Sequence, residues 1–210
     1  WFRVRGVPLA GFAADEVGFF ETTQRIARDG RFPVFGPQVS GGDTYHPGGL
    51  FYWIMALPAA LGRDPRLAGL LTALMSIGGL ALATRVVRDT RGDAAATAFA
   101  GLAALSPWYT AHGDRLDNSS VSVWLGALAL YGLHRMHIQA RSRWVGPVIV
   151  VLAVLPQLHL SAPVLWGVAL GQLLLWRPRI HWPAAAVGLA AGTLLTLPYV
   201  LWEAQHGFTN

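Results

Sequence analysis

The sequence contains no cysteine and no lysine, and it has few charged residues of any kind. Without cysteine, disulfide bonds and thiolate metal sites are excluded, and the cellular compartment stays open. Charged residues make up 13% of the 210 residues, whereas a soluble domain carries roughly 25%. The net charge of +5 comes from arginine alone. These arginines mostly separate apolar segments, which favours a role in membrane topology and argues against nucleic acid as a partner.

Apolar segments dominate the remainder of the chain, since 53% of the residues are hydrophobic. Several charge-free windows have the length of about 20 residues that a helix needs to cross a bilayer. Many of the nine tryptophans lie near the ends of these windows, as expected of an interfacial belt. The sequence therefore predicts an all-α fold, a polytopic transmembrane helix bundle in contact with membrane lipids. We expect about six membrane helices, at residues 65–87, 93–111, 118–137, 144–158, 161–176 and 183–202.

The first 64 residues differ from the rest because they are mostly polar. Residues 15–29 predict an amphipathic helix whose apolar side carries Val17, Phe20 and Ala27, with Phe19 and Ile26 beside them. On its polar side we expect the ion pairs Glu21–Arg25 and Arg25–Asp29. Residues 47–62 are apolar but short and flanked by prolines, which favours a second helix that lies in the membrane plane or re-enters it.

The chain is predicted to form a single membrane domain over residues 1–210, with an external loop at 1–64 and the membrane helices at 65–203. Residues 1–14 lack the pattern of a cleavable signal peptide. Residues 1–5 resemble the exit from an earlier helix, and residues 205–210 resemble a loop that is entered but not finished, so we expect a fragment that is truncated at both ends.

The connections between the predicted helices alternate in charge. Residues 85–93, 135–143 and 177–179 hold eight arginines against two aspartates. The opposite connections hold Asp64, Asp114, Asp117 and Glu203, with Arg63 and Arg115 as their arginines. Because positive charge favours the cytoplasmic side, we expect the acids and the long first loop to lie outside the cytoplasm. The alternation requires that residues 47–62 do not span the membrane.

Ionisable residues near a membrane are by default candidates for function. Asp15 and Glu16 open the amphipathic helix, where Asp15 suits a general base and Glu16 its orienting partner or a metal ligand. An N-cap and a first-turn acid explain the same two residues structurally. Arg115 has the planar fork that matches phosphate, or it forms a local salt bridge with Asp114 or Asp117. Asp117 is equally suited to cap the helix that begins at Asn118.

His159 lies in an apolar stretch between two predicted helices. There it either contacts a substrate or donates to a carbonyl freed beside Pro156 or Pro163. Glu203 ends the last predicted span and suits an interfacial anchor.

Several of these elements, in this order, resemble the GT-C superfamily of glycosyltransferases, in particular the protein mannosyltransferases and the aminoarabinose transferase of lipid A. The elements are Asp15-Glu16, residues 27–30, residues 45–53 (Tyr-His-Pro-Gly-Gly-Leu-Phe-Tyr-Trp), Ser106-Pro107-Trp108, residues 114–117 and residues 158–161. The resemblance covers nearly the whole chain, but each motif alone is weakly specific. Relatives often have Pro-Pro where Gly48 and Gly49 follow Pro47, which predicts a looser helix start here. Many also carry lysine at the position of His46, so phosphate binding through His46 would depend on pH.

The resemblance implies transfer of a sugar from a polyprenyl-phosphate donor to a lipid, glycan or protein acceptor outside the cytoplasm. Asp15 and Glu16 would be catalytic, and His46, Arg115, Asp117 and His159 would bind substrate. No cofactor is certain, and a divalent metal is possible. The expected location is the bacterial inner or plasma membrane, with the active site facing outside. A transporter or a non-catalytic membrane scaffold is the alternative, although the central thirds of the spans carry no Asp, Glu or Arg.

Overall fold

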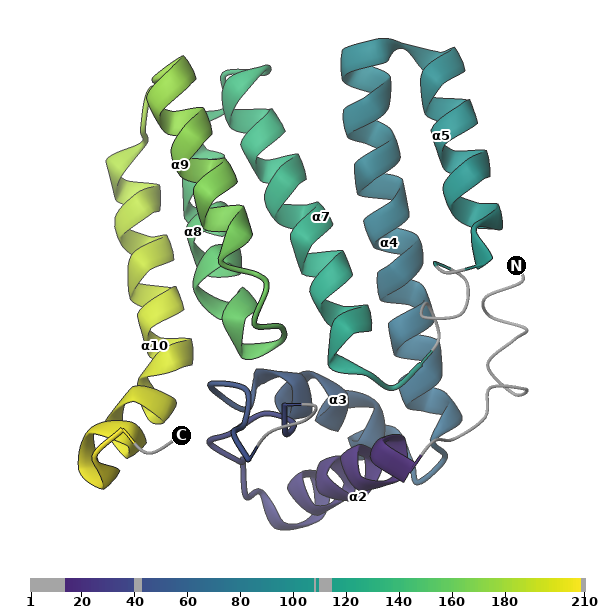
Figure 1. Cartoon of the computed structure of the whole chain (residues 1–210), viewed down its shortest axis with the longest axis vertical. Helices are drawn as coiled ribbons and strands as arrows, with labels where there is room; N and C mark the ends of the chain where they lie inside the picture. The colour runs from purple at the N-terminus through teal and green to yellow at the C-terminus, as the bar shows by residue number, and fades with distance from the viewer. Residues whose placement is uncertain (1–13, 40–42, 108, 110–114, 209–210) are drawn as a thin grey trace.

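The computed structural model describes residues 14–39, 43–107, 109 and 115–208, and regular structure in this part of the chain is helical. Most of these helices stand side by side, and the first two described helices lie across one end of them (Figure 1). The crossing helices are α2 (Ala14–Asp29) and α3 (Leu50–Leu61). The upright helices are α4 (Arg66–Arg91), α5 (Asp93–Leu105), α7 (Asn118–His137), α8 (Val145–Val154), α9 (Val164–Trp176) and α10 (Trp182–His206). Short 3-10 turns flank α8: η2 (Ser142–Trp144) before it and η3 (Leu155–Gln157) after it.

The upright helices occupy the segments predicted from the apolar runs, with differences at their ends. Helix α5 ends at Leu105, short of residue 111, because Ser106 precedes a proline and adopts an extended conformation. Helix α9 begins after Pro163. By length and composition, α4 and α10 could each cross a membrane, whereas α5 and α9 have 13 residues each. The all-α prediction is confirmed for the described residues, and the full set of membrane crossings stays a prediction.

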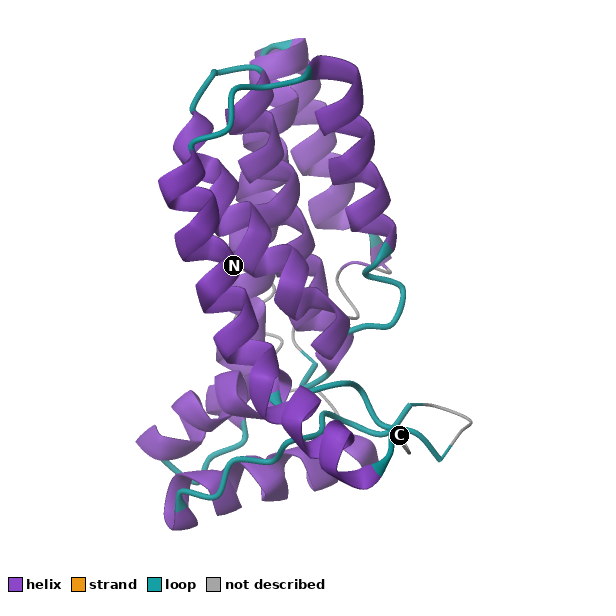
Figure 2. Ribbon diagram, turned by 90° about the vertical axis from the view of Figure 1, so that its left-hand side faces the viewer, coloured by secondary structure: helices purple, strands orange, loops and turns teal. Residues whose placement is uncertain are grey.

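The arginine-rich connections all lie at the end of the bundle opposite the α2–α3 layer. Helix α4 runs away from that layer, and the α4–α5, α7–η2 and α9–α10 connections follow at the far end (Figures 1 and 2). At this end Asp89 joins α4 to α7. Its carboxylate pairs with Arg85 at 3.0 Å and accepts from Gln139 Nε2 at 2.9 Å, and it lies 3.2 Å from Nε2 of the buried His134.

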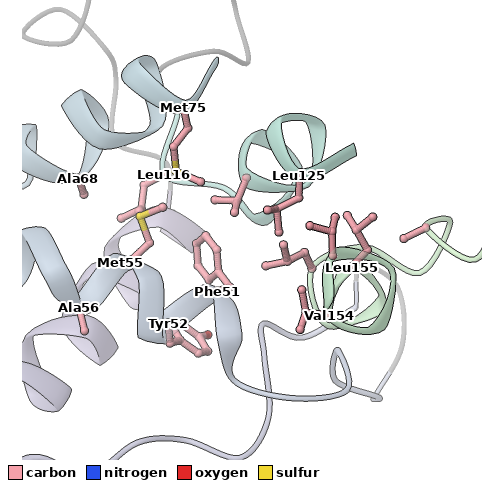
Figure 3. Packing of buried hydrophobic residues seen from close by; sticks show 14 of the residues in the cluster. Phe51, Tyr52, Met55, Ala56, Ala68, Met75, Leu116, Leu125, Val154 and Leu155 are labelled. Carbon is pink, nitrogen blue, oxygen red and sulfur yellow. The ribbon is translucent and has the colours of Figure 1, made fainter. Parts of the chain in front are cut away.

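A hydrophobic cluster fastens the α2–α3 layer to the upright helices. Phe51 and Met55 of α3 are fully buried and point toward Leu116, Leu125 of α7 and Leu155 of η3 (Figure 3). Burying a side chain of this size stabilises the fold by about 2–3 kcal/mol. The two crossing helices therefore pack firmly against the bundle end.

The buried face of α2 differs from the prediction. Thr23 and Ile26 are buried, and Phe19 packs edge-to-face on Phe51, whereas Val17 and Ala27 are exposed. The predicted ion pairs Glu21–Arg25 and Arg25–Asp29 do not form between these described residues. The prediction holds for Phe19, Phe20 and Ile26, which belong to or pack against the hydrophobic cluster. It fails for Val17 and Ala27, because the position of α3 also decides which side of α2 is covered.

The segment before α3 is tightly packed, whereas the looser start of the helix itself stays a prediction. Gly48 has a φ of 99°, a conformation that residues with a side chain rarely adopt. A Cβ atom at this position would overlap the side chain of Gln157. The glycine therefore allows the loop to approach η3 closely.

Helices α8 and α10 also approach closely through glycine. A Cβ atom at Gly188 would lie 2.7 Å from the Cα atom of Gly146, and a Cβ at Gly146 would lie 2.6 Å from the carbonyl oxygen of Ala184. Neither neighbour is a flexible side chain, so any added atom must push the two backbones apart.

Replacing Gly188 with alanine should therefore lower the free energy of unfolding by about 1–3 kcal/mol, the usual cost of overpacking. Thermal unfolding of the purified protein would measure the loss. Gly171→Ala on α9 is the matched control, because nothing lies within 4 Å of its Cβ position, and it should be neutral or slightly stabilising. Equal melting temperatures for the two variants would contradict the close contact.

Candidate functional site

A cavity of about 1140 Å³ lies where the α2–α3 layer meets the ends of the upright helices. Its walls come from α2, Tyr52 of α3, His159 and Leu160, and from two further groups of described residues: Gln38, Val39, Asp43, Tyr45 and His46 of the first loop, and Arg115, Asp117, Asn118 and Ser119 at the start of α7. The cavity brings together the predicted site residues, which are Asp15, Glu16, His46, Arg115, Asp117 and His159. The fold thus brings together residues that lie up to 144 positions apart in the sequence. Their roles stay predictions.

Asp15 and Glu16 lie in the first turn of α2, which begins at Ala14. The side chain of Asp15 is exposed and lines the cavity, whereas Glu16 is buried. Because the helix starts before Asp15, this carboxylate interacts with the positive end of the helix dipole from inside the first turn rather than from the N-cap position. An exposed carboxylate at a cavity wall can accept a proton from a bound hydroxyl or amine.

Arg115 and Asp117 precede α7 and have different surroundings. The Asp117 carboxylate accepts from the backbone N–H of Ser119, so the predicted N-cap is confirmed. Arg115 forms no ion pair with Asp117 or with any other acid in the part of the chain that the structure describes. Asp114 lies outside the described residues. The guanidinium therefore lines the cavity without a described carboxylate partner.

His46 is buried between the first loop and the start of α7. The Asn118 amide Nδ2 lies 2.6 Å from the Leu158 carbonyl oxygen and 3.1 Å from His46 Nε2. An amide that faces a carbonyl this closely must present its N–H₂ group, so His46 Nε2 is an acceptor and the neutral ring carries its proton on Nδ1. Nδ1 is itself buried and makes no hydrogen bond of standard geometry to a described atom, although the Pro156 carbonyl lies near the ring.

The environment of His46 favours the neutral form. Burial lowers the pKa of His46, the nearby His159 lowers it further, and the Pro156 carbonyl acts weakly in the opposite direction. A neutral ring whose Nε2 is already occupied differs from the charged phosphate contact expected from the sequence. Direct binding of phosphate by His46 therefore stays a prediction, and it would require the ring to release Asn118.

His159 lies between η3 and α9 and is partly exposed at the cavity wall. Its Nδ1 lies 2.7 Å from Ser161 Oγ and accepts from the Ser161 backbone N–H at 3.3 Å. The ring centroids of His159 and His46 are 6.4 Å apart. The predicted hydrogen bond from His159 to a freed carbonyl beside Pro156 or Pro163 is not found among the described residues, and Nδ1 accepts from the Ser161 backbone N–H instead.

Sequence reasoning missed several polar residues of the wall. Arg25 of α2 lines the cavity instead of pairing along its helix, and Asp43 approaches from the first loop. Tyr52 is also in the wall; burial and the nearby Tyr45 raise its pKa to about 12, against a smaller opposing effect of Arg25. Its phenol therefore keeps its proton and can donate to a ligand. The helical spacing of Arg25, three residues after Thr22 and seven after Gly18, which also line the cavity, was the available signal.

The described lining contains four carboxylates, Asp15, Glu16, Asp43 and Asp117, and two arginines, Arg25 and Arg115. The described residues nevertheless contain no group of three or more His, Asp or Glu side chains arranged to hold a metal ion. The possible divalent metal stays a prediction. Glu203, expected at an interface, is instead buried on α10, and neither carboxylate oxygen has a hydrogen-bond partner in the described structure.

The lowered pKa of His46 predicts how stability depends on pH. The unfolded ring has a pKa of about 6.5, so between this value and the lower folded pKa the unfolded chain binds more protons. Stability should be fully present above pH 6.5 and should fall as the pH decreases toward the folded pKa. The slope for one proton reaches about 1.4 kcal/mol per pH unit. Melting curves between pH 5 and 8 would measure it.

His46→Gln should flatten this dependence, because glutamine does not titrate and can still accept from Asn118. The control is His206→Gln, since His206 is exposed at the end of α10. Both variants keep the other histidines, so their difference isolates His46. A slope that His46→Gln leaves unchanged would show that the ring titrates equally in the folded and unfolded chain.

Known proteins do not assign a family to this chain. No protein-family model matches it, and neither a curated protein nor a solved structure does so. The resemblance of its motifs to the GT-C superfamily therefore stays a prediction. Its function must be argued from the cavity and the helices around it.

Proposed function

We propose that this chain belongs to a membrane glycosyltransferase of the GT-C type, which transfers a sugar from a polyprenyl-phosphate donor to an acceptor outside the cytoplasm. The observation that carries the proposal is the single cavity lined by Asp15, Glu16, His46, Arg115, Asp117 and His159. These residues belong to sequence motifs that are distributed along the chain. Their convergence at one end of the bundle is what an active site built from those motifs requires.

The chemistry needs a base and positive charge, and the cavity offers both. Asp15 would accept the proton of the acceptor hydroxyl or amine as it attacks the sugar, with Glu16 beside it. The leaving group is a lipid phosphate, which Arg115 and Arg25 would stabilise through charge-assisted hydrogen bonds. Because the lowered pKa keeps His46 neutral near pH 7, the permanent positive charge comes from the arginines.

The exposed surface of the upright helices supports a membrane location. Helix α10 passes the length and apolarity criteria for a span, yet only 11% of its apolar window is buried. A core helix of a soluble protein would be mostly covered. Leu189 and Leu194 on α10, and Leu174 and Leu175 on α9, are each more than 60% exposed. So large an exposed apolar surface needs an apolar environment, and we propose that α9 and α10 contact lipid acyl chains in a bacterial inner or plasma membrane.

The orientation follows from the separation of charge between the two ends of the bundle. The arginine-rich connections would face the cytoplasm, and the α2–α3 layer with its cavity would face outside. There the crossing helices would lie at the level of the lipid head groups, where the phosphate of a lipid-linked donor is also found.

Topology is tested with single cysteines, since the chain contains none of its own. Asp93→Cys, at the arginine-rich end, should react with an impermeant thiol reagent only from the cytoplasmic side. Arg63→Cys, beside α3, should react only from outside. Both residues are exposed, so each should be labelled efficiently from its own side. Labelling of both variants from one side would contradict the orientation.

The mechanism is tested with Asp15→Asn. Removal of a general base typically slows a reaction by about 10²–10⁴-fold. Stability should fall by less than about 1 kcal/mol, because Asp15 is exposed and contributes only a helix-dipole interaction. The measurement is kcat of the purified full-length protein with a panel of polyprenyl-phosphate sugars, alongside its melting temperature.

Glu21→Gln is the control, since Glu21 is an exposed acid on the same helix that does not line the described cavity. It should keep a normal rate. A normal rate for Asp15→Asn with an intact fold would remove the base from the mechanism. If the wild-type protein transferred no sugar from any member of the panel, the transporter or scaffold alternative would replace the glycosyltransferase.

A further inference from the structure

The hydrogen bonds of Ser161 determine which nitrogen of His159 carries the proton. Ser161 Oγ is 2.7 Å from Nδ1, and the Ser161 backbone N–H donates to the same nitrogen at 3.3 Å. A backbone N–H can only donate, so Nδ1 must be the acceptor and the Ser161 hydroxyl must donate to it as well. The neutral ring of His159 therefore carries its proton on Nε2.

The two imidazoles of the cavity thus have opposite tautomers. His46 accepts from Asn118 at Nε2, and its Nδ1 is buried. His159 accepts at Nδ1, is partly exposed at the cavity wall, and has no bond from Nε2 to any described residue. Of the two rings, His159 is the one whose N–H group is available to a ligand.

We infer that Ser161 is a positioning residue that holds His159 with Nε2–H as a hydrogen-bond donor to a phosphate oxygen of the lipid-linked donor. The inference rests on the proposed function for the identity of the ligand. A phosphate oxygen accepts hydrogen bonds from neutral as well as charged groups, so His159 would complement the charge of Arg115 with a directed bond. His46, occupied by Asn118, would support the wall instead of contacting the ligand.

The tautomer is measured directly by ¹⁵N NMR of the histidine-labelled full-length protein. Wild-type His159 should show the pattern of a neutral ring protonated at Nε2. Its Nε2 resonance should shift when farnesyl phosphate is added in detergent, and it should shift less with inorganic phosphate at the same concentration. Equal shifts would assign the bond to free phosphate and overturn the inference for the lipid-linked ligand.

Ser161→Ala removes the hydroxyl donor but keeps the backbone N–H on Nδ1, so the tautomer protonated at Nε2 should become less favoured without being lost. The dissociation constant of farnesyl phosphate and the KM for the sugar donor should rise about three- to tenfold, the range expected for one neutral hydrogen bond. The kcat should change by less than about twofold, because the bond acts on binding. Ser161→Thr keeps the hydroxyl and should restore the wild-type values. Ser142→Ala, at the far end of the bundle, is the matched serine control and should change neither constant.

A His159 protonated at Nδ1 in the wild-type protein would overturn the inference. So would a Ser161→Ala protein with an unchanged tautomer, dissociation constant and KM. In either case normal sugar transfer would leave the proposed function standing. Conversely, absence of transfer by the wild-type protein would reject the proposed function, while the NMR tautomer and farnesyl phosphate binding would still decide the role of Ser161.

Discussion

The packing of α3 against the end of the bundle is the contact on which the cavity depends. Phe51 and Met55 are fully buried there among side chains of α7 and η3 and Leu116 (Figure 3). This cluster holds α2 across the bundle through the contact between Phe19 and Phe51. Gly48 allows the preceding loop to approach Gln157, which brings His46 to Asn118. Asp15 and Glu16 of α2 therefore line the same cavity as Arg115 and His159 because the apolar helix α3 packs against both α2 and the bundle end.

The arrangement of the helices could be predicted to a large extent from local properties of the sequence. Apolar runs and prolines located the upright helices within a few residues, because hydrophobic length and helix breaking act within a segment. The short run around Phe51 indicated a helix that does not stand upright, and α3 lies across the bundle end. The acidic pair Asp15-Glu16 can be identified as a candidate site from the sequence alone.

Features that depend on distant segments could not be predicted in the same way. The periodicity of α2 predicts that Val17 is covered, but Val17 is exposed and the polar Thr23 is buried. The sequence indicates Asn118 only as the start of a helix. In the structure its side-chain amide donates hydrogen bonds to His46 Nε2 and to the Leu158 carbonyl. In the sequence, His46 lies 72 positions from Asn118 and Leu158 lies 40 positions from it. Such hydrogen bonds depend on which helix ends meet in the fold. The local pattern of apolar and polar residues carries no information about that.

The described cavity lining combines charged carboxylates and guanidiniums with two hydrogen-bonded imidazoles. Placing carboxylates and guanidiniums in the middle of a bilayer is costly, and in the described structure these groups of the cavity lie at one end of the helices. Both histidines accept a hydrogen bond at one ring nitrogen, from Asn118 Nδ2 at His46 and from the Ser161 backbone N–H at His159. Phosphate recognition at neutral pH would then use arginine for charge and imidazole for direction.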